Sequence, residues 1–112
     1  MIVFRPVPSS ESLNEIAYEA VEDNSVCGIC HMTYNPQKAT VDSITYDEDK
    51  PYIVEGLLKS IFNFAAQNNI YIGCCTCANI AAFLDRMNFE KTGDTYYNDI
   101  PSILTGNCCK KV

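Results

Sequence analysis

The fold is decided by residues 47–89, which read DEDKPYIVEGLLKSIFNFAAQNNIYIGCCTCANIAAFLDRMNF. The first half has a helical repeat of apolar residues at Val54, Leu57, Leu58, Ile61, Phe62 and Ala65. This repeat predicts a helix that begins at Pro51 and ends at Asn68-Asn69. The apolar run from Ile70 to Thr76 then predicts a buried strand. A second helix is predicted from the spacing of Ile80, Phe83, Leu84 and Met87, with Thr76 as its N-cap and Asn88 at its end.

Two β-like runs precede this segment. Val26 to Tyr34 and Thr40 to Tyr46 are separated by Asn35-Pro36-Gln37-Lys38, which has the composition of a turn. The two runs therefore predict an antiparallel hairpin. Ile2 to Phe4 predicts a further short strand at the start of the chain.

The stretch between these strands has a helical pattern. Ser12 and Glu15 have the spacing of a capping box. The apolar residues that follow recur at helical spacing until Asp23-Asn24; they are Leu13, Ile16, Ala17, Ala20 and Val21. The pattern predicts one helix here. Thr95 to Tyr97 predicts a last strand near the C-terminus.

Charge and length exclude several classes of protein. The 112 residues carry 14 Asp and Glu against 8 Lys and Arg, a net charge of −6. This balance gives no basic surface, so nucleic acid and anionic membranes are not expected partners. No apolar run reaches the roughly 20 residues that span a bilayer. We therefore expect one cytoplasmic domain covering residues 1–112, whose seven cysteines are mainly reduced.

The order of these segments resembles the cofactor-binding half of the GNAT acetyltransferase superfamily. The matching segments are Val26 to Cys30, Thr40 to Tyr46, Asp49 to Leu58, Ile70 to Thr76, and Cys77 to Phe89. The resemblance implies an α/β (α+β) fold with a mixed, mostly antiparallel sheet flanked by helices. The chain looks truncated on its N-terminal side, with the strand that normally precedes Val26 missing. That truncation would leave an exposed sheet edge, suited to a homodimer or a partner chain.

The resemblance implies acetyl-CoA or CoA as the cofactor. In the family, a small-residue turn at a helix N-terminus holds the pyrophosphate with backbone amides. The matching positions in this chain imply that the cofactor is bound by Ile44, Lys50, Tyr52, Ile53, Val54, Glu55, Gly56 and Asn79. The turn itself departs from the family, because Tyr52 and Val54 stand at its two small positions and Asp49 at its first position.

The resemblance also implies an acceptor amine and a CoA thioester as reactants. The residues matched to the chemistry are Glu48 as base and Tyr46 or Cys77 as acid. Leu84 stands where many members carry a tyrosine that protonates the leaving thiolate, and a leucine cannot donate a proton. Two functions stay open: an acetyl-CoA-dependent N-acyltransferase, and a non-catalytic GNAT-like module that binds another ligand or a protein.

A third and weaker alternative comes from the cysteines. Cys27-x-x-Cys30 and Cys74-x-x-Cys77 have the spacing of zinc ligands. However, residues three apart on a strand point to opposite faces, so we interpret them as buried apolar side chains and expect no metal. A redox role for the first pair meets the same objection. Cys77 begins a predicted helix, where the helix dipole is expected to lower its pKa.

Overall fold

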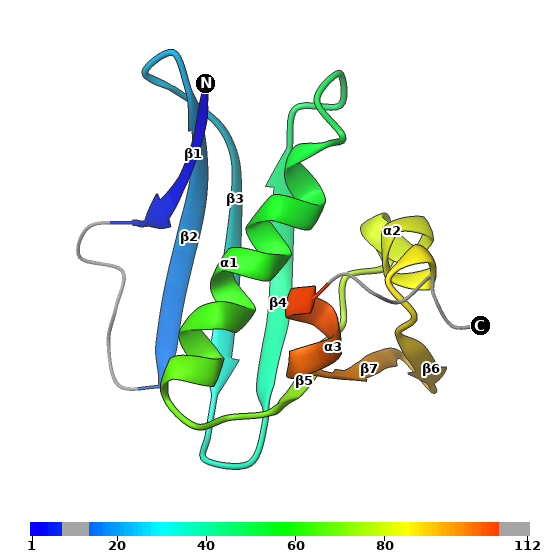
Figure 1. Cartoon of the computed structure of the whole chain (residues 1–112). Helices are drawn as coiled ribbons and strands as arrows, with labels where there is room; N and C mark the ends of the chain where they lie inside the picture. The colour runs from blue at the N-terminus through cyan, green and yellow to red at the C-terminus, as the bar shows by residue number, and fades with distance from the viewer. Residues whose placement is uncertain (8–13, 106–112) are drawn as a thin grey trace.

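The structure is a computed structural model that describes residues 1–7 and 14–105. Its strands are β1 (Ile2–Pro6), β2 (Glu15–Glu22), β3 (Ser25–Tyr34), β4 (Ala39–Tyr46), β5 (Ile72–Cys75), β6 (Glu90–Thr92) and β7 (Thr95–Asp99). Its helices are α1 (Ile53–Gln67), α2 (Ala81–Arg86) and α3 (Ile100–Thr105), with a short 3-10 helix, η1 (Ala78–Ile80), before α2. Figure 1 shows α1 lying lengthwise across one face of the sheet, with α3 beside it.

The strands form one sheet in the order β1-β2-β3-β4-β5-β7-β6. The first four strands are antiparallel neighbours, as are β5, β7 and β6. The pair β4 and β5 is parallel, because α1 carries the chain back across the sheet between them. The hairpin predicted over Val26 to Tyr46 is confirmed.

The core lies between α1 and the sheet. The apolar residues predicted for this helix are fully buried, as are its first residue, Ile53, and Cys30 and Val41 of the sheet. At the N-terminal half of α1 the helix approaches β1 closely: a Cβ added to Gly56 would lie 2.1 Å from Cζ of Phe4. A glycine is therefore needed where the ring of Phe4 meets the helix.

The helix predicted after Ser12 is wrong over the described residues, because Glu15–Glu22 is strand β2. Ser12 and Leu13 lie outside the described residues. Ile16 and Ala20 point toward α1, whereas Ala17 and Val21 lie on the opposite face, and all four are buried. A strand buried on both faces loses its polar–apolar alternation, and here the remaining apolar positions imitate a helical repeat.

The same finding corrects the prediction of a missing strand. The strand before the hairpin is present as β2, and it pairs with β1 and β3. The connection between β1 and β2 spans residues 7–14, most of which lie outside the described residues. The edges of the sheet are β1 and the three-residue β6.

Among the described residues, five non-glycine residues adopt left-handed backbone conformations, and all are Asn or Asp: Asn14, Asp23, Asn24, Asn69 and Asn88. Two of them form the β2–β3 turn, and two end α1 and α2. Asn69 and Asn88, which the sequence predicts at the ends of these helices, are both among them. Asn and Asp adopt it more readily than other residues that carry a side chain.

The C-terminal elements are only partly as predicted. The strand at Thr95 is confirmed as β7, but β6 and α3 were not predicted. The side chain of Asp99 caps α3, because its carboxylate accepts hydrogen bonds from the backbone N and the hydroxyl of Ser102 at 2.9 and 3.0 Å. Within the described residues, the longest helix is α1 with 15 residues, and none has the length and apolar character needed to cross a bilayer.

Phe62→Ala is expected to lower the free energy of unfolding by about 3–5 kcal/mol, because Phe62 is fully buried and its removal leaves a cavity. Phe64→Ala is the matched control on the same helix. Phe64 is only half-buried, against the ring of Tyr34, so its loss should stay below about 2 kcal/mol. Urea unfolding of both variants measures the difference, and equal losses would contradict this placement of the core.

Candidate functional site

Strands β4 and β5 part in the middle of the sheet. They are paired over Ala39 to Val41, and the N–H of Thr76 adds a last hydrogen bond to the carbonyl of Val41 at 3.1 Å. The adjacent register with β3 jumps from Val41 to Ser43, which leaves Asp42 as an extra residue in β4. Such a bulge bends a strand and ends its regular pairing. The rest of β4 is therefore not paired with β5.

Three candidate residues, Ile44, Cys77 and Asn79, lie at this opening, which we call the β4–β5 opening. Asn79 Nδ2 donates a hydrogen bond to the carbonyl of Ile44 at 3.1 Å, from η1 to the unpaired part of β4. Cys77 Sγ donates to the carbonyl of Val41 at 3.6 Å. The sequence-predicted pair Ile44 and Asn79 is thus brought together, across the gap that the two strands leave.

The turn before α1 is held by its own hydrogen bonds. The N–H of Ile53 donates to the carbonyl of Lys50, and the N–H of Val54 donates to that of Pro51, both at 3.2 Å. The side chains of Ile53 and Val54 are buried in the core. The side chain of Val54 therefore does not block a ligand that approaches the turn from the solvent. Gly56, which was also predicted to bind the cofactor, faces Phe4 on the sheet.

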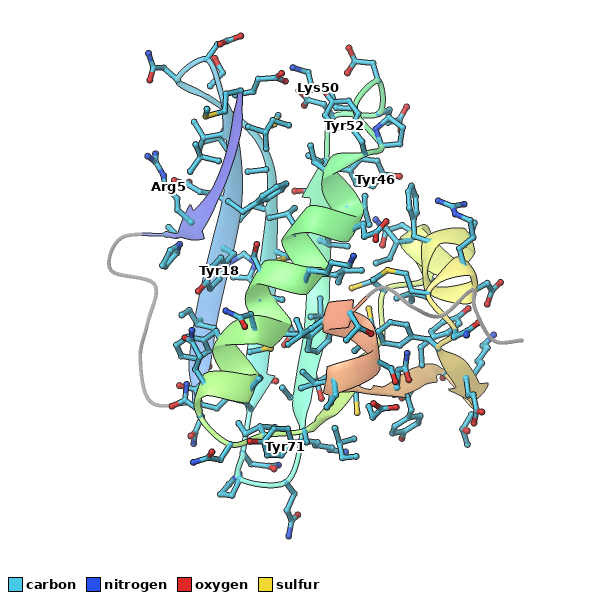
Figure 2. The ribbon with its side chains drawn as sticks, in the orientation of Figure 1. Arg5, Tyr18, Tyr46, Lys50, Tyr52 and Tyr71 are labelled. Carbon is cyan, nitrogen blue, oxygen red and sulfur yellow. The ribbon has the colours of Figure 1, made fainter. Side chains whose placement is uncertain are left out.

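Lys50 and Tyr52 meet a carboxylate from another part of the chain. Lys50 Nζ donates to Glu22 Oε1 at 2.8 Å, and the hydroxyl of Tyr52 donates to the same oxygen at 3.3 Å. Figure 2 shows Lys50 and Tyr52 together at the N-terminal end of α1. The hydrogen bond with Lys50 lowers the pKa of the Glu22 carboxyl, and the bond with Glu22 raises the pKa of Lys50.

A shallow depression of about 330 Å³ lies beside this turn, between α1 and α2. It is lined by Pro51, Tyr52, Glu55, Phe83 and Arg86. The guanidinium of Arg86 lies 4.7 Å from the centre of the Phe83 ring, a cation–π distance.

The three predicted catalytic residues differ in their surroundings. Tyr46 is half-buried and meets Phe83 edge-on, with 6.0 Å between ring centres; Phe83 lines the depression, and Tyr46 does not. Glu48 is exposed in the loop after β4 and is not one of the residues lining the depression. Cys77 is buried, and its contact with the thiol of Cys75 together with burial raises its pKa. The expected lowering of the Cys77 pKa is therefore wrong.

The cysteines are separate thiols packed into the core. Five of them are described, all free and all buried: Cys27, Cys30, Cys74, Cys75 and Cys77. Burial raises the pKa of Cys30 to about 12. Over residues 1–7 and 14–105 there is no group of three or more His, Cys, Asp or Glu side chains arranged to hold a metal ion. Cys108 and Cys109 lie outside the described residues.

Sequence reasoning missed three residues of this region. Glu22 comes from the end of β2, 28 residues before Lys50, and no local pattern connects the two. Phe83 and Arg86 are three residues apart on α2, a spacing that places two side chains on one helix face. That spacing was visible, but Phe83 was interpreted only as a core position.

No protein-family model matches the sequence, and no curated protein sequence matches it. Solved structures do match the fold. The ribosomal-protein-S18-alanine N-acetyltransferase from Escherichia coli gives a TM-score of 0.73 at 10% identity, over 89% of this chain and 94% of that chain. A GNAT family acetyltransferase from Elizabethkingia anophelis with acetyl-CoA bound gives 0.67 at 13% identity, over 81% and 77%. A chain of the KacTA–DNA complex gives 0.70 at 10% identity, over 94% and 97%.

These likenesses establish the fold. The chain has the GNAT fold, in the form predicted from its sequence: a mixed, mostly antiparallel sheet flanked by helices. The low identities fit a divergent sequence.

Alkylation by iodoacetamide at pH 8 should be slow at the five described cysteines in the native protein and fast in urea. For Cys30 a pKa of about 12, compared with the ordinary 9.0, reduces the thiolate fraction about a thousandfold, and burial adds a steric barrier. Mass spectrometry of peptides after timed quenching measures each site. Fast modification of Cys30 in the folded protein would contradict its placement in the core.

Proposed function

We propose that the protein binds a CoA thioester at the β4–β5 opening and transfers its acyl group to an amine. The observation that carries this proposal is the parting of β4 from β5 directly beside the N-terminus of α1. The fold is shared with acetyltransferases, one of which holds acetyl-CoA. The thioester would supply an activated acyl group.

The unpaired part of β4 fits an extended ligand that carries amides. Its backbone groups beyond Val41 are free of β5, and the carbonyl of Ile44 is engaged by a side chain, Asn79, that can turn away. Backbone amides between Ile44 and Tyr46 would polarise the carbonyl that is attacked. The phosphates of the CoA thioester would lie at the end of the site next to the turn before α1. There they would meet the cations Lys50 and Arg86 and the hydroxyl of Tyr52.

Proton transfer would fall to side chains near the opening. The amine must lose a proton, and the leaving thiolate must gain one. We assign Tyr46 as the acid, because its ring packs against Phe83, which lines the depression. The raised pKa of Cys77 makes this thiol a weaker acid than the resemblance implied. Glu48 is exposed, and its carboxylate would accept the amine proton through an intervening water molecule.

A second function is favoured by a different observation. The groups that would hold phosphate already have partners: Lys50 binds Glu22, and the N–H groups of Ile53 and Val54 are bonded within the turn. A non-catalytic module that binds another ligand or a protein needs none of them. Its partner could be a second copy of this chain at the edge strand β1, where Val3 is exposed.

The free thiols of the described cysteines support a reducing compartment, and we place the protein in the cytoplasm.

Titration with acetyl-CoA, followed by thermal unfolding, tests cofactor binding. At 100 times Kd the ligand should stabilise the protein by about 2.7 kcal/mol. Arg86→Glu should weaken binding about tenfold or more, because it places a negative charge in the depression. Lys91→Glu is the matched control, since Lys91 makes the same charge change on β6 and does not line the depression.

The same proteins separate the two functions. Binding together with acetyl transfer to a primary amine supports the enzyme, whereas binding without transfer supports the module. No stabilisation at millimolar acetyl-CoA contradicts the CoA proposal as a whole.

A further inference from the structure

Glu22 connects the β2–β3 turn to the turn before α1. Among the described residues of these two segments, it is the one whose side chain forms hydrogen bonds between them. Its Oε1 accepts from Lys50 Nζ at 2.8 Å and from the Tyr52 hydroxyl at 3.3 Å. Both donors belong to the turn that precedes α1, whereas Glu22 ends β2. The carboxylate therefore reaches across from a separate part of the sheet.

The turn before α1 is mainly acidic, which makes the partner of Lys50 important for anion binding. Residues 47–56 contain four acidic residues and one basic residue, Lys50. An anionic ligand that approaches the turn finds its favourable charge in Lys50, and Lys50 is held by Glu22. The two ends of the ion pair are 30% and 24% exposed, so a ligand can reach them.

A carboxylate and a phosphate compete for the same donors. Both are anions that accept from an ammonium and a hydroxyl at similar distances. In the observed arrangement the oxygen of Glu22 takes one donor from each of Lys50 and Tyr52, as a phosphate oxygen would. The contact costs little to break, because a partly exposed ion pair contributes little to stability.

We propose that Glu22 is a specificity-determining residue that competes with the phosphate groups of the ligand for Lys50 and Tyr52. This inference rests on the proposed binding of a CoA thioester. Glu22 lowers the affinity for anionic ligands in proportion to the charge they bring to the turn. A ligand with phosphates must displace Glu22, whereas one without phosphates, such as an acyl pantetheine, binds beside it.

The test compares Glu22→Gln with Glu15→Gln, using CoA and pantetheine as probes. Both substitutions remove one negative charge from β2, but Glu15 lies at the opposite end of the strand from the turn. Glu22→Gln should tighten CoA binding about fivefold, the worth of one exposed ion pair. Glu15→Gln should leave it unchanged, and neither should alter pantetheine binding. Lys50→Met added to Glu22→Gln should remove the gain. Isothermal titration measures each Kd, and thermal unfolding without ligand confirms that each variant is folded.

The outcomes separate this inference from the proposed function. If the unchanged protein binds CoA and Glu22→Gln does not bind it more tightly, the competition is overturned and the CoA site stands. If Glu22→Gln alone binds CoA, the competition is supported, and the unchanged protein is assigned to the non-catalytic function. If neither binds CoA, both proposals are overturned. An equal gain for Glu15→Gln would reduce the effect to net charge and overturn the role of Glu22.

Discussion

The extra residue in β4 is the constraint on which the candidate site depends. Because β3 and β4 are tied by regular hydrogen bonds on either side of Asp42, β4 has to absorb one residue by bending. The strand then continues against β3 but leaves β5, whose direction is fixed by α1 and by its pairing with β7. The opening is therefore produced inside a well-packed sheet, and no mobile loop is required to form it.

The packing around α1 explains why the elements next to the opening hold their positions. Ile53 and Val54 are part of the core, so the first turn of the helix is fixed at the same depth as the residues below it. Gly56 lets Phe4 close the space between the helix and the edge strand. The turn before α1 is thereby fixed by burial on one side, and polar side chains such as Lys50, Tyr52 and Glu55 lie on the accessible side.

The sequence predicts the parts of the fold in which one side of an element is polar. In α1 the helical repeat is clear, because Glu55, Lys59 and Asn63 mark a solvent face. In β2 both faces are buried and so is Glu19 at its centre, so no residue there marks a solvent face, and Ile16, Ala17, Ala20 and Val21 imitate a helix. The short α3 was missed because six residues are too few for a periodic signal. For the candidate site, a resemblance suggested Ile44 and Asn79, and the structure brings these two residues together. The contact of Glu22 with Lys50 could not, because it depends on how two distant turns meet.

The five left-handed Asn and Asp residues bear on the unfolded chain as much as on the native one. Glycine would fit these positions with less strain, but each glycine would increase the number of conformations that the unfolded chain can sample. With a side chain at each turn, the chain begins folding from a more restricted ensemble and accepts a small local strain in the finished structure. The protein has only five glycines in 112 residues. Part of its stability thus comes from the low conformational entropy of its unfolded chain.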